Sequence, residues 1–359
     1  MDDEKFDPWP DPAQALEAAD EPVAPEDPTA PAPRRRRLLR ALGLVTVLLV
    51  VIVSAAGFWI YRHLDGNIHT DTATEQALNA QASSRPKPSA ANVENVLIMG
   101  SDYRPELGSA RSDTVLLVHV SGDGRRAEVI SVPRDLMVQI PACRTSDGRQ
   151  SQAQYAQFNW SFDFGGAACT IRTFEQLTDI RVDHYMVLGF DGFAKIIDSV
   201  GGVELNLPDA ERDPNVGLDL TAGPHLLDGQ QALAYVRARE YVGDGSDTNR
   251  MARQQQFMRV LSAKLSSTGV LFNPVRLYQV LDAATSAITA DPGLDSLDKL
   301  YGLVQRLRGV PQGQTDYRTV PLKPYPADPN RDVLEEPAAG QLFAALRADR
   351  PYPAAGTTG

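Results

Sequence analysis

The chain has 359 residues, of which 43% are hydrophobic and 23% are charged, proportions that are typical of a globular protein with a large core. Its formal net charge is −11 at pH 7, which excludes a protein that binds nucleic acid through its overall charge. The five histidines show none of the spacings that zinc sites use, so we expect no zinc.

The first 60 residues divide into a polar segment and an apolar one. Residues 1–33 are rich in Asp, Glu, Pro and Ala, which predicts disorder. Four arginines, Arg34 to Arg37, precede an uncharged run from Ala41 to Ile60, and about 20 apolar residues suffice to cross a bilayer. Because arginines mark the cytoplasmic side, we expect a disordered cytoplasmic tail at 1–37, a single-pass transmembrane helix at 38–61 and an extracytoplasmic remainder.

A cleaved signal peptide is the alternative, with Ser54-Ala55-Ala56 as its cleavage site. We favour the uncleaved anchor, because the apolar region is long for a signal peptide and an acidic, proline-rich segment precedes it. In both cases Cys143 and Cys169 lie where a disulfide is permitted. It would contribute about 2–4 kcal/mol. The alternative is two free, buried thiols.

Strand and helix patterns alternate after the anchor, so we expect one α/β domain from residue 92 to 350. Residues 62–91, with a short helix near 71–78, would be a linker, about 143–169 a glycine-containing loop, and 351–359 a disordered C-terminus. The expected strands are 93–99, 115–120, 127–132, 184–188, 203–207 and 317–320. The expected helices are 171–177, 190–200, 250–265, 274–288, 295–308 and 340–346.

The segment Ala234–Arg239 is expected to be a further strand, with an unusual pair of arginines. In a strand, Tyr235, Arg237 and Arg239 fall on one face, so two guanidiniums point the same way. Neither can lose its proton, and a phosphate lying across both would relieve their repulsion. The alternative is two surface arginines in ordinary ion pairs.

Acidic residues and arginines also stand at the borders of three successive strands, and the carboxyl ends of strands are where ligands gather in α/β sheets. A predicted helix adds polar residues at spacings of three and seven, which share one helix face. The candidate site residues are Asp102, Arg104, Arg111, Asp113, Arg134, Arg237, Arg239, Asp247, Arg250 and Gln254.

Many arginines with a few carboxylates fit a polyphosphate ligand and a divalent ion. Mg²⁺ prefers one or two carboxylates together with phosphate oxygens, and arginines stabilise charge that develops on phosphoryl oxygens. We find no serine nucleophile elbow, Cys/His pair or Walker loop, so covalent catalysis is not indicated. The alternative for each residue is a structural ion pair at a strand end.

These motifs, in this order after a single N-terminal anchor, resemble the LytR-CpsA-Psr family. The resemblance covers about residues 92–265, and the C-terminal part is similar to the family's remaining helices and strand. It rests on Asn95–Arg104, Arg111–Thr114, Val132–Asp135, Asp183–Tyr185, Phe190–Phe193, Val200–Val203, Tyr235–Arg239 and Asp247–Gln255.

The resemblance implies an α-β-α domain with a central mixed sheet and a membrane-anchored phosphotransferase activity. Such an enzyme moves a glycopolymer from a polyprenyl-pyrophosphate carrier to peptidoglycan through a phosphodiester. It implies Mg²⁺ (or Mn²⁺) on Asp102 and Asp113. The pyrophosphate and neighbouring phosphate would be held by Arg104, Arg111, Arg134, Arg237, Arg239, Arg250 and Gln254, with Asp247 orienting an arginine.

Catalytic roles would fall to Asp102, as candidate base, and to Arg134, Arg237 and Arg239. The prenyl chain would enter an apolar tunnel between sheet and helices, with candidate lining residues Phe190, Phe193, Ile197, Phe257 and Leu261.

One position departs from the family's pattern, because Gln157 stands where a lysine is common. If the family's lysine contacts phosphate, this protein lacks one positive charge at that place. Two alternatives therefore stay open besides the transferase: a phosphatase that hydrolyses the polyprenyl pyrophosphate, and a non-catalytic protein that binds the lipid carrier.

Overall fold

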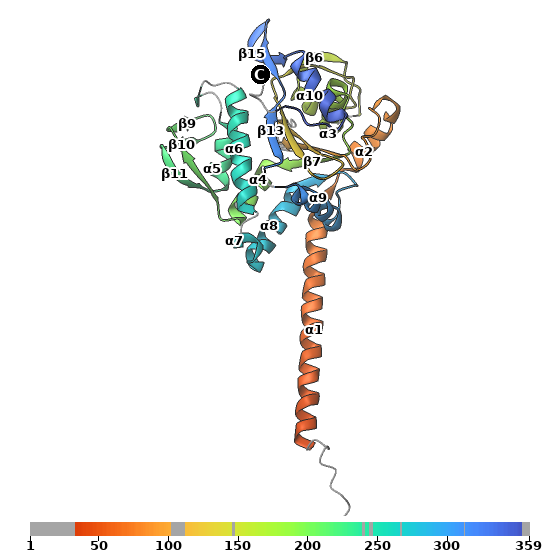
Figure 1. The fold of residues 1–359 in the computed structure, drawn as a ribbon, viewed down its shortest axis with the longest axis vertical. Helices are drawn as coiled ribbons and strands as arrows, with labels where there is room; N and C mark the ends of the chain where they lie inside the picture. Colours follow the sequence, from red (N-terminus) through yellow and green to blue (C-terminus); the bar gives the residue numbers. More distant parts are fainter. Residues whose placement is uncertain are drawn as a thin grey trace, which may run out of the picture. The chain divides into compact units, whose positions relative to one another are not determined.

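A computed structural model describes residues 33–101, 112–145, 148–238, 241–243, 247–265, 268–311 and 313–353 of the chain (Figure 1). Residues Met1–Phe58 and Trp59–Gly359 form two compact units. The first contains most of helix α1 (Pro33–Asn67), whose stretch Arg37–Asn67 is long and apolar enough to cross a membrane. This helix fits the single-pass anchor that the sequence predicts.

The second unit is built on a seven-stranded mixed sheet. Its strand order is β1-β12-β7-β2-β3-β4-β13. The pairs β1–β12, β7–β2 and β4–β13 are parallel, and the pairs β12–β7, β2–β3 and β3–β4 are antiparallel. These strands are β1 (His69–Thr70), β2 (Glu94–Ser101), β3 (Ser112–Val120), β4 (Ala127–Val132), β7 (His184–Gly189), β12 (Ile288–Ala290) and β13 (Thr315–Thr319).

Helices cover both faces of this sheet, which confirms the predicted α-β-α architecture. Alternate residues of a strand point to opposite faces. On β2, Leu97 and Met99 are buried in one core cluster with Phe174 of α3 and Leu342 of α10, whereas Val96 is buried in another with Leu303 of α9. The covering helices are α2 (Thr72–Asn79), α3 (Trp160–Thr178), α9 (Leu297–Gly309) and α10 (Ala338–Arg347).

A third core cluster lies among four helices beside the sheet (Figure 1). These helices are α4 (Phe190–Ser199), α5 (Gly229–Arg237), α6 (Asp247–Leu265) and α8 (Pro274–Ala287). The short helices η1 (Ala82–Ser84) and α7 (Thr268–Leu271) connect larger elements. Four two-stranded antiparallel sheets complete the described fold: β5 (Met137–Ile140) with β6 (Gln154–Gln157), β8 (Val203–Leu207) with β11 (Gly223–Leu227), β9 (Glu211–Asp213) with β10 (Leu218–Leu220), and β14 (Leu322–Tyr325) with β15 (Asp328–Leu334).

The predicted arginine strand is wrong, because residues Gly229–Arg237 form helix α5 and Ala238 caps it. The Asp228 side chain accepts from the Gln231 amide, and the Gln231 side chain accepts from the Asp228 amide, which closes a capping box at the helix start. A short apolar run with period-two alternation does not distinguish a strand from a helix, and this cap favours the helix. The side chains of Tyr235 and Arg237 therefore leave the helix in different directions.

The segment 62–91 is folded onto the domain rather than a linker. His69 and Thr70 pair with β12, and Leu78 of α2 is buried in the core. The Arg85 guanidinium reaches Glu175 of α3, with Nη2 2.6 Å from Oε1 and Nε 2.9 Å from Oε2. Both side chains are buried, so the segment is held by an ion pair that water does not screen.

The expected loop at about 143–169 is a hairpin followed by a helix. It contains β6 and the first half of α3, which begins at Trp160 and continues past Gly165 and Gly166 with a kink. Gly166 has φ +60°, a conformation that glycine adopts readily. Because glycines weaken a helix pattern in the sequence, only the apolar end at 171–177 was predicted.

A disulfide joins Cys143 to Cys169 in the structure, across 26 residues of sequence. We expect Cys143→Ser/Cys169→Ser to lower the free energy of unfolding by about 3 kcal/mol, because the unfolded chain regains the entropy of an open loop of that length. Urea unfolding of both proteins measures the difference. Equal stability of the variant and the wild type would contradict this prediction, and dithiothreitol should mimic the substitutions.

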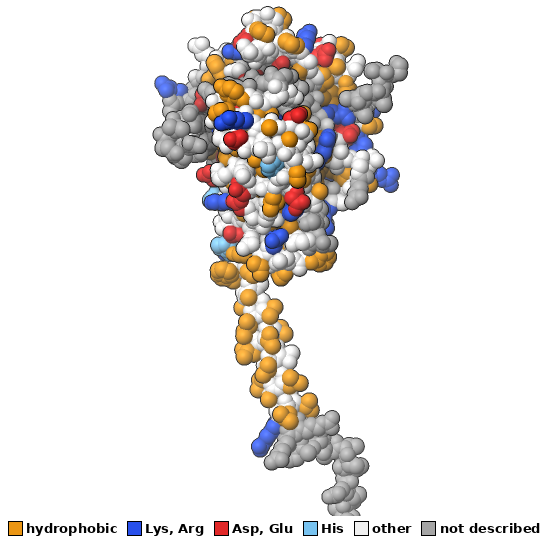
Figure 2. All heavy atoms as spheres, turned by 90° about the vertical axis from the view of Figure 1, so that its left-hand side faces the viewer, with side chains coloured by type: hydrophobic (Ala, Val, Ile, Leu, Met, Phe, Trp, Pro, Cys, Tyr) orange, Lys and Arg blue, Asp and Glu red, His pale blue; other side chains and the backbone are white. Residues whose placement is uncertain are grey.

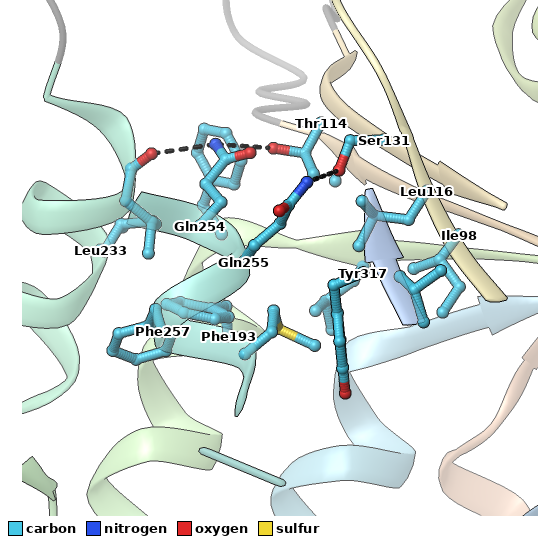
Figure 3. A pocket seen from close by; sticks show the side chains of 16 residues that line it. Ile98, Thr114, Leu116, Ser131, Phe193, Leu233, Gln254, Gln255, Phe257 and Tyr317 are labelled. Atoms are coloured by element: carbon cyan, nitrogen blue, oxygen red, sulfur yellow. Dashed lines mark hydrogen bonds between the residues drawn. The ribbon is translucent and has the colours of Figure 1, made fainter. Parts of the chain in front are cut away.

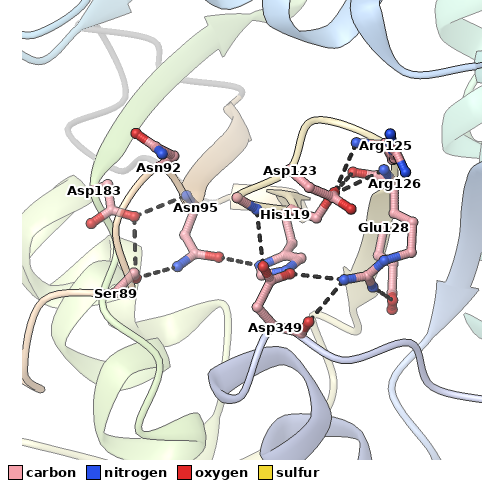
Figure 4. A network of polar contacts seen from close by, with 12 residues as sticks. Ser89, Asn92, Asn95, His119, Asp123, Arg125, Arg126, Glu128, Asp183 and Asp349 are labelled. Atoms are coloured by element: carbon pink, nitrogen blue, oxygen red, sulfur yellow. Dashed lines mark hydrogen bonds and ion pairs between the residues drawn. The ribbon is translucent and has the colours of Figure 1, made fainter.

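A buried polar network fastens the C-terminal end of the domain to the sheet (Figure 4). His119 of β3 is 1% exposed, and its Nδ1 lies 2.7 Å from Oδ1 of Asn95. Its Nε2 lies 3.5 Å from Asp349, which also accepts a hydrogen bond of 2.9 Å from Arg126. The residues beyond α10 are thereby tied to β3 and β4.

Because the pKa values of two histidines shift in opposite directions, we expect the free energy of unfolding to pass through a maximum as pH changes. Burial lowers the pKa of His119, whereas a hydrogen bond to Asp291 raises the pKa of His184. A lowered pKa costs stability as pH falls below the unfolded value of about 6.5, and a raised pKa gives stability that is lost as pH rises through the folded value. We expect His119→Asn to flatten the acid side of the stability curve and His184→Asn the alkaline side. Urea unfolding at pH values below and above about 6.5 tests this prediction. If each variant kept the wild-type dependence of unfolding free energy on pH, the assignment to these histidines would be refuted.

Candidate functional site

The candidate site lies at one edge of the central sheet, where several strands end. Strands β2, β4, β7 and β13 all run in the same direction, because β3 is antiparallel to both β2 and β4. Their carboxyl ends therefore share an edge with the start of β3. The start of β3, which contains Asp113, and the border after β4, which carries Arg134, lie at this edge.

Asp113 occupies an unusual backbone position within this edge. Gly100 pairs with Thr114 and Ser101 pairs with Ser112, so Asp113 is the extra residue of a β-bulge. Bulges redirect a side chain and are frequent beside active sites. The predicted site residues Asp102, Arg104, Arg111 and Arg239 lie outside the described residues, and the side chains of Asp113 and Asp247 are not described. Asp247 is the first residue of α6.

Arg237 ends helix α5 beside the end of β7. Its guanidinium carbon lies 4.8 Å from the centroid of the Phe190 ring, the first residue of α4. A cation over an aromatic face is held by the ring quadrupole, and the helix C-terminus also favours a positive charge. Arg237 is half-buried, so its charge is fixed at this edge and still accessible to an anion.

Helix α6 lines the site with amide and cationic side chains. Gln254 Nε2 donates to the Val236 carbonyl (3.0 Å) and to Thr114 Oγ1 (3.3 Å), so it joins α5 to β3. Gln255 Nε2 lies 3.2 Å from Thr319 Oγ1 and 3.4 Å from Ser131 Oγ (Figure 3). Gln254 of the predicted polar face thus contacts the sheet, and Arg250, one turn earlier on the helix, is 3% exposed.

Arg253 on the same helix has a structural role. Its Nη2 donates to the Ala238 carbonyl, and its Nη1 lies 3.4 Å from Glu211 Oε2. It is 8% exposed, and both contacts are with residues of the domain. The contact fixes the C-terminus of α5, and with it Arg237, against α6.

Gln157 contacts a residue of the β4 border. Its Nε2 donates to Asp135 Oδ1 at 2.8 Å, and Arg134 Nε lies 3.6 Å from the other oxygen of that carboxylate. Asp135 is 5% exposed. A neutral amide thus occupies the position where a lysine would face the same buried carboxylate. Gln157 thereby contacts the carboxylate that follows Arg134 in the sequence.

An apolar pocket of about 130 Å³ opens between the sheet and helices α4, α5 and α6 (Figure 3). This is close to the size of apolar cavities that admit benzene, about 150 Å³. Phe190, Phe193 and Phe257 line it, as predicted for the tunnel, whereas Ile197 and Leu261 are buried in the neighbouring core. Thr114, Ser131, Gln254 and Gln255 gather at one end of it. The pocket therefore has a polar end and an apolar body.

The hydroxyl groups of Thr114, Ser131 and Thr319 were missed by the sequence reasoning. Thr114 and Ser131 sit near the ends of the largely apolar strands β3 and β4, which is the signal that could have found them, whereas Thr319 ends the polar strand β13. In the described part of the chain, no group of three or more His, Cys, Asp or Glu residues could hold a metal ion.

The site thus combines an apolar pocket with amide side chains at one end and the Arg237 guanidinium beside it, a combination that suits an amphiphile with an anionic head group. The LytR_cpsA_psr family model matches residues 60–342, and the chain belongs to this family. The match includes the segment 62–91, in agreement with its place in the fold.

Three relatives illustrate this membership. The chain is 31% identical to the probable cell wall biosynthesis protein LcpB of Corynebacterium glutamicum, over 70% of this chain and 61% of that protein, so it spans about three fifths of that relative's length. It is 27% identical to a polyisoprenyl-teichoic acid–peptidoglycan teichoic acid transferase of Halalkalibacterium halodurans, over 74% and 83% of the two chains. A solved LytR-Csp2A-Psr enzyme from Actinomyces oris is 26% identical, with a TM-score of 0.58 over 73% and 93% of the chains.

Proposed function

We propose that this protein is a membrane-anchored transferase that moves a glycopolymer from a polyprenyl-pyrophosphate carrier to peptidoglycan. The observation that carries the proposal is the apolar pocket, whose polar end meets the sheet edge where Arg237 and Gln254 lie. A prenyl chain needs the apolar body, and a pyrophosphate needs the cationic edge. The relatives named as cell wall biosynthesis proteins and teichoic acid transferases support the same class of reaction.

In this proposal the arginines hold the pyrophosphate and stabilise the charge that builds on its oxygens during transfer. Arg237 is fixed for this by Phe190 and by the Arg253 contact to Ala238. Arg104, Arg111, Arg134, Arg239 and Arg250 are proposed to complete the cationic shell, with Asp247 orienting a neighbouring arginine. Asp102 is the proposed base for the acceptor hydroxyl.

We also propose that Mg²⁺, or Mn²⁺, is held by Asp102 and Asp113. The bulge at Asp113 lies next to the pair of Ser112 with Ser101, and Asp102 follows Ser101 in the sequence. Carboxylate and phosphate oxygens suit this ion, which would neutralise charge on the pyrophosphate.

The proposed topology has the N-terminus in the cytoplasm and the domain on the outer face, because Arg34–Arg37 and Arg40 precede the apolar part of α1. The outer face is where peptidoglycan is assembled and where the Cys143–Cys169 disulfide is compatible with the compartment.

The test uses the full chain in detergent with Mg²⁺, a polyprenyl-pyrophosphoryl saccharide and peptidoglycan fragments. We expect mass spectrometry to find a saccharide joined to the fragment through a phosphodiester. Release of lipid monophosphate and uncoupled saccharide would instead indicate the phosphatase. Bound but unreacted donor would leave the non-catalytic lipid-binding protein.

A further inference from the structure

The last two turns of α1 are fixed to the domain by helices α8 and α9. His63 Nε2 and Asn67 Nδ2 each lie 3.0 Å from Oδ1 of Asp282 on α8. The Leu297 amide at the start of α9 donates to Asp65 (3.0 Å), and the Tyr61 hydroxyl reaches Asp298 (3.2 Å). Residues Tyr61–Asn67 are therefore held on this side of the domain, directly after the apolar stretch of α1.

The contacts also give the direction of α8. Asn67 reaches Thr285 and Ser286, one turn past Asp282, whereas His63 lies one turn earlier on α1 and meets Asp282. The two helices thus run in the same direction, so the N-terminal end of α8 lies on the side from which α1 enters the domain. Val275 lies seven residues before Asp282, on the same face and about 10 Å away along the axis.

Large apolar side chains are exposed on this side. Val275 is 66% exposed and Phe272, just before α8, is 81% exposed. Tyr301 lies one turn after Asp298 on α9 and is 63% exposed. Trp59 of α1, one turn before His63, is 63% exposed and has the amphipathic character of a membrane-interface residue. Figure 2 shows hydrophobic side chains gathered at this end of the domain.

We propose that Phe272, Val275 and Tyr301 form a docking surface that inserts into the head-group region of the bilayer beside α1. An exposed apolar patch of this kind marks an interaction site, and its continuity with the anchor identifies the partner as the lipid surface. The proposal rests on α1 crossing the membrane and does not require the transfer reaction.

Docking through these residues would also fix the direction of the apolar pocket relative to the bilayer. A Cβ on Gly192 of α4 would meet Ala287 at the C-terminal end of α8, and Gly201, after α4, lies against Arg276 near its start. Helix α4 therefore runs antiparallel to α8 and ends on the membrane side.

Helix α6 runs in the same direction as α4. Phe257 packs on Phe193 at 5.7 Å between ring centroids, and Lys264, two turns later, lies 3.6 Å from Glu204, which follows α4. The polar end of the pocket, with Gln254 and Arg237, is then distal to the bilayer. The apolar body lies nearer to it, so a prenyl chain can enter tail-first from the membrane with its head group held above.

Site-directed spin labelling of the full chain in phosphatidylcholine vesicles tests the proposal. The native cysteines form a disulfide, so a label attaches to one introduced thiol in Phe272→Cys, Val275→Cys or Tyr301→Cys. Tyr155→Cys is the matched control, because Tyr155 is 50% exposed on β6 and packs on Tyr325 of β14, away from α1.

Accessibility of the nitroxide to oxygen and to a water-soluble nickel chelate is compared between vesicles and detergent. We expect the oxygen-to-nickel ratio to rise severalfold in vesicles at positions 272, 275 and 301 and to stay constant at 155. Equal ratios at the three positions and at 155 would overturn the proposal. Because no donor or acceptor is present, this result is independent of whether the protein is a transferase.

Discussion

We expect Arg237→Ala to lower kcat/KM for transfer about 100- to 1000-fold, the effect of removing one fixed donor from a charge-stabilising site. Arg237 is half-buried over Phe190, a residue that lines the pocket, so its guanidinium is held in place beside the pocket. Arg237→Lys should keep part of the activity, because it retains the charge and loses the planar fork. Coupled product is measured by mass spectrometry.

Arg212→Ala is the matched control for this prediction. Arg212 forms an ion pair with Asp219 in which both side chains are 74% exposed, so we expect wild-type activity. The thermal midpoint of Arg237→Ala should stay near that of the wild type, which separates a loss of charge stabilisation from a loss of folding. If Arg237→Ala transferred saccharide at the wild-type rate, the assignment of Arg237 to the pyrophosphate would be abandoned.

Glu175→Gln should lower the free energy of unfolding by about 3–5 kcal/mol, because it leaves the charge of a buried arginine without its counter-ion. Arg85 and Glu175 are 7% and 3% exposed, and Glu175 Oε1 also accepts from the Val182 amide at 3.0 Å. The pair joins the segment after α2 to α3. Urea unfolding followed by Trp160 fluorescence measures the effect.

The double variant Arg85→Met/Glu175→Leu provides the control. It removes both charges and fills similar volume, so we expect it to be more stable than Glu175→Gln alone. A double variant that is no more stable than the single one would show that the loss comes from packing rather than from the isolated charge.

The sequence correctly predicted those strands and helices whose apolar residues recur with the period of the element that forms. The strand pattern 127–132 and the helix patterns 190–200 and 250–265 match β4, α4 and α6, because their apolar residues recur with the period that packing on the sheet requires. The order of strand borders also predicted that the positions of Asp113 and Arg134 would share an edge with Gln254 nearby. For Asp102, Arg104, Arg111 and Arg239, the assignment stays a prediction.

Three features were decided by tertiary structure. Arg237 is on a helix because the capping box at Asp228 and the packing of Tyr235 in the core stabilise α5. The six-residue alternation of the sequence contains no information about the cap or the packing. The segment 62–91 is folded because Arg85 finds a counter-ion ninety residues later in the chain. Gln157 donates to Asp135, a contact that only the fold reveals. The sequence thus determines local periodicity and residue chemistry, whereas contacts between distant residues decide the conformation of short, ambiguous segments.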